Sequence, residues 1–504
     1  MPANSINVFS FSIVASFFSS LFLYFITIST QFWYIKERYN LNSVKDEDMK
    51  KNRTLFLSAV ASGTMLNPLN SSMIALALHS IQKDFQLSFA TVSWLISSFY
   101  LASAVAQPVT GKIGDIFGRK KTFLIGLVLV ALSAIGAPLS TSFLLLLGMR
   151  LVQSIGSSAI YPSGMALIRD NIKEKPASAL AVLSIFASAM VALGPTIGGF
   201  LIVWGGWSAI FWVNFPFIII SFLLGWYMFP KDVKKDKAHL KKLFSNMDFM
   251  GMFFFAAGMV FFLWFLLSIE TKIHYFSGIT GIVFFCLFFW RELNVKEPFI
   301  DIQIFKSHTK LSMVYIQFIL LNIFFYCLFF GLPSYFQEVL DLSVEKSGLL
   351  MLFMSGISIV ISSVTGKWID RKGVYQPIVI GAFLSIVGGL SFTLFFVGSS
   401  YWVIGIILSI MGLSYGIGNV VLQVAMVKES PKEIVGTTSG LFQTCRYLGS
   451  ILSSIILGLI FGEEISAESM KIIGTVLIIT GIISFLMSLW FSRETINIRK
   501  MKHV

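Results

Sequence analysis

Long apolar runs separated by short charged segments constrain the fold of this chain more than any other feature of its sequence. A bilayer core of about 30 Å is crossed by roughly 20 apolar residues in a helix. By this measure the sequence predicts fourteen spans, near 54–80, 90–110, 122–139, 142–168, 177–203, 208–229, 249–269, 277–290, 311–335, 347–366, 375–396, 401–427, 434–461 and 471–491. No run alternates in polarity as barrel strands do, and backbone groups in lipid must bond internally. The sequence therefore predicts an all-α integral membrane protein.

A further apolar stretch, from Val8 to roughly Ile28, precedes these spans and leaves the status of residues 1–48 open. The segment can be an extra span, a signal-like sequence, or sequence upstream of a start at Met49. It lacks a charged amino-terminal region and a clear small-residue cleavage site, which argues against a signal peptide. We expect an N-terminal extension that the remainder of the chain does not need.

The composition excludes several classes of protein. Hydrophobic residues make up 56% of the chain and charged residues 12%, whereas soluble domains carry about 25% charged residues. The net charge of +13 is spread over short gaps and does not form the clustered patch that nucleic acid needs. The three cysteines and five histidines show no metal-ligand spacing, and no phosphate-binding loop is present. We expect no enzyme activity, no cofactor, no metal and no nucleic-acid partner.

Lysine and arginine predict the orientation, because cytoplasmic loops of membrane proteins are enriched in both. With the segment before the first span placed inside, alternate loops and ends carry 29 basic residues, and the loops on the other side carry 4. Both ends of the fourteen-span body are therefore predicted to be cytoplasmic.

Two loops on the predicted cytoplasmic side resemble each other. Gly, Lys, Asp and Gly recur at the same offsets in 111–118 and 366–373, which lie 255 residues apart. Internal repeats are typical of transporters, whose substrate site lies between the repeated halves. We expect six-helix bundles at 54–229 and 311–491, a basic linker with an inserted helix pair at 230–310, and a cytoplasmic tail at 492–504.

The first loop and its neighbours carry a resemblance to a known family. Residues 111–121 are similar to the signature loop of the major facilitator superfamily, and residues 50–495 resemble its fourteen-helix drug/proton antiporter branch. The matching residues are Gly111, Asp115, Gly118, Arg119 and Lys120 in the first loop, and Gly366, Asp370, Arg371 and Gly373 in the second. The resemblance implies that the loop locks the two halves when the cavity faces outward. A simpler interpretation is a positive-inside anchor.

Other matches lie inside the spans. Gly194, Pro195, Gly198 and Gly199 in the fifth span resemble the antiporter motif of the family, which implies export; small residues also permit close helix packing. Arg150 matches an arginine tied to proton coupling in the family, although a buried arginine can also organise hydrogen bonds. Arg446 matches an arginine common in this branch, and its role stays open.

The first span departs from the family pattern. Asn70 stands where many members carry an aspartate, and His79 where they carry a proline. No Asp or Glu lies within the predicted spans, and the nearest are at span edges: Asp248, Glu270, Glu338 and Glu433. Recognition of cations by a buried carboxylate, and proton coupling through it, are therefore in question. Candidate cavity residues with polar side chains are Gln337, Asn322, Gln423, Asn419 and Tyr415.

These observations favour a secondary active transporter in the cell membrane that exports small amphipathic compounds in exchange for protons, acting as a monomer within the lipid bilayer. The alternative is a transporter of one dedicated solute, in the uptake direction or uncoupled. A membrane sensor without transport fits less well, because the sequence offers no sizeable soluble domain.

The charge pattern yields a test of topology. A cysteine at Ser245, in the basic linker, is expected to be shielded from membrane-impermeant maleimide in intact cells. A cysteine at Ser466, between the last two spans, is expected to react. Reaction at Ser245 with protection at Ser466 would reverse the predicted orientation.

Overall fold

The computed structural model describes 53–87, 89–92, 94–232, 248–268, 273–295, 298–300, 302, 308–342, 344–461 and 465–501. Within these residues every regular element is a helix. The predicted N-terminal extension at 1–48 lies outside the described part, as does the central portion of the basic linker, 233–247.

The helices follow the predicted apolar runs in order. The first group comprises α3 (Arg53–Thr64), α4 (Leu66–Asp84), α5 (Phe89–Val92), α6 (Trp94–Phe117), α7 (Arg119–Gly136), α8 (Phe143–Asn171), α9 (Pro176–Gly205), α10 (Ala209–Trp212) and α11 (Asn214–Met228). The middle pair is α13 (Phe249–Ser268) and α14 (Tyr275–Asn294). The last group comprises α16 (Thr309–Glu338), α17 (Val344–Lys372), α18 (Tyr375–Phe395), α19 (Tyr401–Glu429), the 3₁₀ turn η2 (Lys432–Ile434), α20 (Val435–Phe461) and α21 (Ala467–Met501).

Ten helical segments of the described part are long and apolar enough to cross a membrane. They establish a multi-pass helical membrane protein, and they fall short of the fourteen spans that the sequence predicts. The shortfall has physical causes. The helix α3 has 12 residues and separates from α4 at Met65, and α7 carries three basic residues in its first turn, at 119–121. The ten segments therefore do not establish the predicted count.

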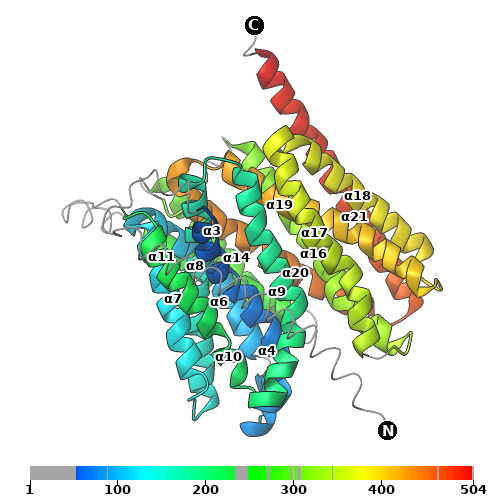
Figure 1. Cartoon of the computed structure of the whole chain (residues 1–504), viewed down its shortest axis with the longest axis horizontal. Helices are drawn as coiled ribbons and strands as arrows, with labels where there is room; N and C mark the ends of the chain where they lie inside the picture. Colours follow the sequence, from blue (N-terminus) through cyan, green and yellow to red (C-terminus); the bar gives the residue numbers. More distant parts are fainter. Residues whose placement is uncertain are drawn as a thin grey trace, which may run out of the picture.

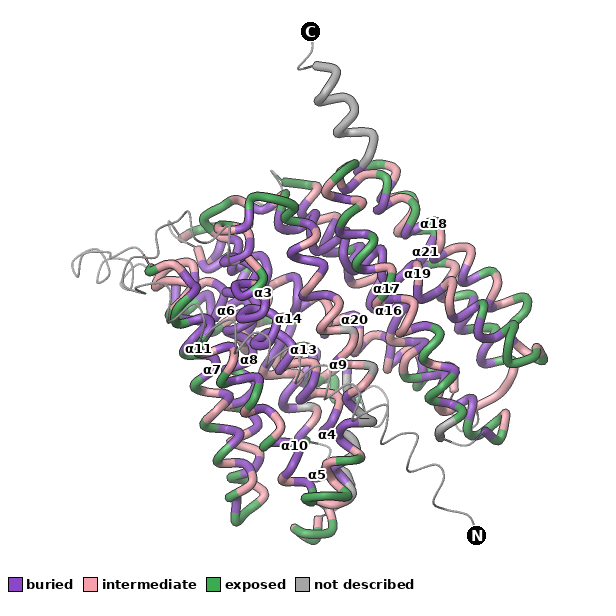
Figure 2. Tube along the Cα trace, in the orientation of Figure 1, coloured by how far each residue is buried: buried purple, intermediate pink, exposed green. Residues whose placement is uncertain are grey.

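The helices form two groups that meet along extended contacts. Figure 1 places α7, α8 and α11 on one side of the molecule and α17, α18 and α21 on the other. The groups are joined where α6 packs on α20 and where α9 packs on α17. A continuous core of buried apolar side chains runs through both groups, and Figure 2 shows the buried segments concentrated in the middle of the molecule.

The outer surface of the bundle is itself apolar. Val203 is 90% exposed, and Trp204, Phe276 and Trp402 are each more than three-quarters exposed. Exposure of such surfaces to water is unfavourable, whereas lipid chains are as apolar as the side chains themselves. This distribution agrees with a protein that is surrounded by lipid.

The pair α13 and α14 packs against one of the two junctions. A second core cluster joins Phe255, Met259 and Leu263 of α13 to Ala104 of α6 and Ile451 of α20. The helix α13 therefore covers the α6–α20 interface and contacts both groups of helices there, and α14 packs on α13.

Glycines let the backbones of α6 and α20 come into direct contact. A Cβ atom added at Gly440 would lie 2.3 Å from the carbonyl oxygen of Gln107, and one at Gly111 would lie 2.3 Å from that of Gly436. Small residues at helix crossings in membranes permit this approach, which longer side chains prevent. The α6–α20 interface therefore depends on the absence of side chains at these positions.

We expect Gly440→Ala to force α6 and α20 apart and to lower stability by about 1–3 kcal/mol, as overpacking does. Thermal unfolding of the purified protein measures the effect as a lower Tm. Gly356→Ala in α17 is the matched control, because no atom of the described residues lies within 4 Å of a Cβ there. Equal Tm values for the two variants would contradict the close contact.

Candidate functional site

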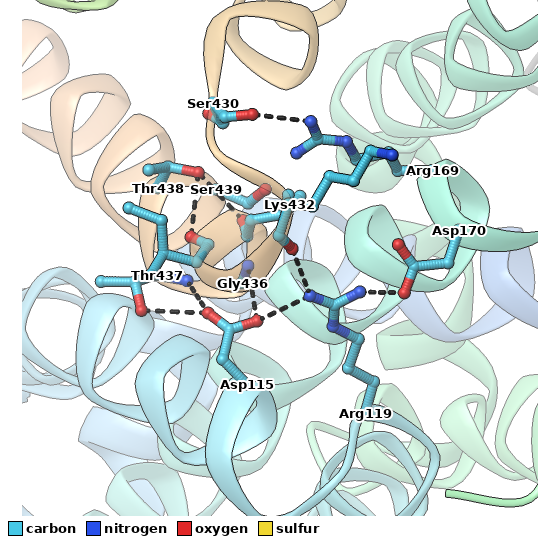
Figure 3. A network of polar contacts seen from close by, with 12 residues as sticks. Asp115, Arg119, Arg169, Asp170, Ser430, Lys432, Gly436, Thr437, Thr438 and Ser439 are labelled. Atoms are coloured by element: carbon cyan, nitrogen blue, oxygen red, sulfur yellow. Dashed lines mark hydrogen bonds and ion pairs between the residues drawn. The ribbon is translucent and has the colours of Figure 1, made fainter. Parts of the chain in front are cut away.

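The first repeated loop joins the two groups through Asp115. Its carboxylate accepts hydrogen bonds from the backbone N–H of Gly436 at 3.0 Å and of Thr437 at 2.9 Å, and from the Thr437 hydroxyl at 3.1 Å (Figure 3). Gly436 and Thr437 form the first turn of α20, whose N–H groups have no acceptor within their own helix. Asp115, 321 residues earlier in the chain, therefore supplies a cap and a favourable charge to the N-terminus of α20.

Two arginines bind the turn that precedes α20. Arg119 donates to the carbonyl oxygen of Lys432 at 3.0 Å and also pairs with Asp170. Arg169 donates to the carbonyl oxygen of Ser430 at 2.6 Å. Carbonyl groups at the end of α19 and in η2 thus receive donors from α7 and α8 (Figure 3).

The second repeated loop makes the corresponding contact at the α9–α17 interface. Asp370 of α17 accepts hydrogen bonds from the backbone N–H of Ala177 and of Ser178, each at 3.0 Å, and from the Ser178 hydroxyl. These residues form the first turn of α9. A Cβ at Gly366 would lie 2.7 Å from that of Ala181, so the two helices touch one turn away. Each repeated aspartate therefore caps a helix of the other group.

The ends of the two loops differ in their partners. Gly118 and Gly373 both have positive φ, of 116° and 81°, a conformation that glycine adopts without strain. After Gly118, Asp232 accepts the N–H of Lys120 at 3.1 Å, and the Lys120 ammonium donates to two carbonyls at the end of α11, at 2.5 and 2.8 Å. Arg371, in the second loop, is exposed. The first loop is thus anchored more firmly than the second.

Arg150 lies deep inside the first group of helices. It is 1% exposed, donates to Gln153 at 2.6 Å and stacks over the ring of Phe99 at 4.3 Å. Its Nε and Nη2 atoms have no hydrogen-bond partner within the described part of the chain, and neither has the side chain of Gln107. A charged side chain inside a membrane span raises the free energy of insertion, so residues of this kind usually have a function. Arg150 therefore has donors available for a further partner inside the first group of helices.

A cavity of about 410 Å³ lies between the two groups of helices. Its wall contains Tyr100 of α6, Tyr326, Phe329 and Phe330 of α16, and serines from α4 and α20. Leu263 of α13 also contributes, so α13 lines the cavity as well as covering the α6–α20 interface. The described lining includes neither aspartate nor glutamate.

Arg446 lines a smaller cavity next to the first. Tyr326, Phe329 and Val191 belong to the walls of both. Arg446 donates to Asn419 at 3.4 Å and lies 5.6 Å from the ring centre of Phe318, and its Nε atom lacks a partner among the described residues. The arginine therefore retains hydrogen-bonding capacity beside a space lined by aromatic rings.

Asn70 occupies a structural position away from these cavities. Its amide exchanges hydrogen bonds with the amide of Asn214, at 2.8 and 2.9 Å, and donates to the carbonyl oxygen of Leu66 at 2.7 Å. The side chain is 3% exposed and joins α4 to α11. Gln337 is exposed and donates to Pro333 at 3.1 Å. Neither Asn70 nor Gln337, which the sequence suggests as coupling or cavity residues, is in the described lining of the two cavities.

The glycines of the predicted antiporter motif pack α9 against α4. A Cβ at Gly194 would overlap the Ser72 hydroxyl, and one at Gly198 would lie 3.1 Å from the Cβ of Met73. Gly199 is half-buried, and the side chain of Pro195 lies outside the described part. Because Ser72 lines the larger cavity, this packing sets the position of one cavity wall.

Several residues of the site carry no distinctive signal in the sequence. Tyr100, Tyr326 and Phe329 are aromatic residues in apolar runs that contain many others. Gln423 accepts from Ser184 and donates to Tyr161 at 2.8 Å, which joins α19 to α9 and α8. The sequence indicates this role of Gln423 only by placing a polar residue inside an apolar span.

Substitution of the capping aspartates tests the two junctions. Asp115→Asn and Asp370→Asn each remove the negative charge that strengthens the hydrogen bonds of the cap. Hydrogen bonds to a charged group contribute about 1.5–3 kcal/mol each. Both variants are expected to insert into the membrane. Spin labels at Lys121 and Glu433 are expected to report a longer distance in Asp115→Asn than in the parent. Glu338→Gln, at an exposed carboxylate, is the control. An unchanged distance in Asp115→Asn would reduce the loop to a topological anchor.

Comparison with known proteins agrees with this architecture. The sequence profile of the Major Facilitator Superfamily matches residues 60–454. The MFS-type transporter YwoD of Bacillus subtilis (strain 168) is 64% identical over 443 residues, which cover 88% of this chain and 98% of YwoD. The tetracenomycin C resistance and export protein of Streptomyces glaucescens is 28% identical over 417 residues, covering 81% and 76%.

A solved structure shares the fold. The human organic anion transporter MFSD10 (TETRAN) superimposes with a TM-score of 0.63 at 16% identity, covering 86% of this chain and 99% of the human protein. At that identity the likeness concerns the fold alone. The profile match and the similarity to YwoD go further, and they show that the chain belongs to the major facilitator superfamily of membrane transporters.

Proposed function

We propose that the protein exports amphipathic compounds by alternating access, in exchange for protons, as a member of the fourteen-helix drug/proton antiporter branch. The pair of aspartate caps carries this proposal. Asp115 and Asp370 hold the two groups of helices together at one end through hydrogen bonds that water can replace. Their release would let that end open while the opposite end closes.

The proposed topology has fourteen crossings. In it, α3 with α4, α5 with α6, and α10 with α11 each make one crossing, and every other described α-helix makes one. The six-helix bundles are 54–229 and 311–491, the linker and inserted pair are 230–310, and 492–504 form the tail. We propose that this unit acts as a monomer, since its cavity is enclosed by helices of a single chain.

The larger cavity, of about 410 Å³, favours neutral or anionic aromatic compounds as substrates over cations, and Arg446 lines a space of only about 20 Å³ beside it. Tyr100, Tyr326 and Phe329 offer ring faces for stacking, and serines offer hydrogen bonds at the wall. Arg446 supplies a positive charge nearby, whereas the described lining has no carboxylate to balance a cation. The Streptomyces relative, which is named for resistance and export, supports the outward direction.

One observation favours the alternative of a dedicated solute transporter that is uncoupled or works in uptake. Asn70, at the position where many relatives carry an aspartate, is fully engaged with Asn214 and cannot titrate. The uncoupled form of this alternative needs no proton gradient, and the uptake form moves its solute inward, so both differ measurably from proton-driven export.

Transport by proteoliposomes with an imposed pH gradient separates them. We expect gradient-dependent movement of fluorescein, an aromatic anion, and little movement of tetraphenylphosphonium. Movement of fluorescein that ignores the gradient would support the uncoupled alternative instead.

Substitution of Arg446 tests the proposed substrate class. Arg446→Gln removes a charged donor worth about 1.5–3 kcal/mol, so the apparent affinity for fluorescein is expected to fall at least about tenfold. Arg446→Lys keeps the charge and is expected to fall less. Arg371→Gln, at an exposed arginine, serves as the control. An unchanged affinity in Arg446→Gln would contradict recognition of anions at this cavity.

A further inference from the structure

Two buried carboxylates lie at the ends of the inserted helix pair, outside the site described above. Asp248 directly precedes α13, and Glu292 lies in the last turn of α14. Each residue is 5% exposed. The sequence placed Asp248 at a span edge and gave no sign that Glu292 would be its neighbour, because the two residues belong to different helices.

One oxygen of each carboxylate has clear partners. Asp248 Oδ1 accepts the N–H of Gly251 at 2.9 Å, which caps α13, and the Nε of Arg291 at 2.6 Å. Glu292 Oε2 accepts the N–H of Ile300 at 3.1 Å. These contacts explain why both side chains point inward.

The other two oxygens lie near each other, and neither has a hydrogen-bond partner among the described residues. Asp248 Oδ2 and Glu292 Oε1 are buried and have no hydrogen bond to any described residue. A Cβ added at Gly251 would lie 2.3 Å from Oδ2 and 2.6 Å from Oε1, so the two oxygens lie within 5 Å of one another. Gly251 leaves the space between them open.

Two basic side chains lie near the pair, Arg291 at Asp248 and Lys112 near Glu292. Arg291 of α14 pairs with Asp248, and its side chain is 32% exposed. Among the described residues, Lys112 of α6 acts electrostatically on Glu292, and its ammonium donates to the carbonyl oxygen of Pro298 at 3.2 Å. Two ionised carboxylates at this separation repel each other strongly when buried, and such pairs commonly hold one proton.

We propose that Asp248 and Glu292 form a proton-binding site in which one proton, taken from water and returned to it, is shared between Oδ2 and Oε1. The site goes beyond the proposed export function and does not require that protons drive transport. It assigns a chemical role to the inserted helix pair in addition to packing.

Hydrogen bonds and the α6 backbone connect this site to the Asp115 cap. Glu292 holds Ile300, the neighbouring Pro298 accepts from Lys112, and Lys112 precedes Asp115 by three residues on α6. A shared proton keeps the carboxylates together and so keeps the 298–300 segment in place. Loss of the proton would make them repel and loosen the support of α6 beside the α20 N-terminus. Acidic conditions therefore favour the closed arrangement.

Infrared difference spectroscopy of the purified full chain in lipid nanodiscs tests the proton site. Between acidic and alkaline buffer, the parent is expected to show a carboxylic acid C=O band that shifts in D₂O. Glu292→Gln and Asp248→Asn are each expected to lose this band, and Glu338→Gln, at an exposed carboxylate, is expected to retain it. A band of unchanged size in both buried-site variants, or its absence from the parent, would overturn the proposal.

A distance measurement with spin labels shows whether the variants are folded, and it tests the connection to Asp115. In a Cys286→Ser background, spin labels at Lys121 and Glu433 are expected to report a closed distance in acid and a longer one in alkali. Glu292→Gln provides an amide N–H in place of the proton, so its distance is expected to stay closed in both buffers. A distance in Glu292→Gln that follows pH as in the parent would contradict the connection. Transport of fluorescein is not needed for either result, so failure here is distinct from failure of the export proposal.

Discussion

The structure depends on one physical requirement, that the unpaired N–H groups at a helix N-terminus find acceptors. At two junctions these acceptors come from the other group of helices: Asp115 caps α20, and Asp370 caps α9. Each cap combines hydrogen bonds with a favourable interaction between a negative charge and the helix dipole. Hydrogen bonds of this kind are strong where water is excluded, and water molecules can replace them where the interface opens. They therefore suit a contact that must form and break in each transport cycle.

Glycine makes these caps possible. Gly111 and Gly436 let α6 and α20 approach until their backbones touch, and Gly366 does the same for α17 on α9. The two junctions differ in their surroundings, because α13 covers the α6–α20 interface. The inserted pair also contributes Leu263 to the cavity wall. The α13 helix thus contacts both the interface that carries the cap and the wall of the cavity.

Charge is distributed in an uneven way through the interior. Arg150 and Arg446 lie within apolar helices, whereas the buried carboxylates Asp248 and Glu292 lie at the ends of the inserted pair. Arg446 lines the smaller cavity, and the two acids lie outside the described lining of both cavities. In the proposed scheme, substrate and proton therefore bind at different places, and coupling between them acts through helix movement.

The sequence by itself determined the class of protein, the order of its helices, and the two loops that matter most. Hydropathy and charge are properties of short segments, so the apolar runs, the repeat at 111–118 and 366–373, and the resemblance to the superfamily could all be read along the chain. Tertiary structure alone decided which residues meet. It brought Asp115 to Thr437, paired Asn70 with Asn214 instead of exposing it to a cavity, and placed Asp248 beside Glu292. These contacts join residues far apart in the chain, and their formation depends on how whole helices pack, which no local pattern of residues specifies.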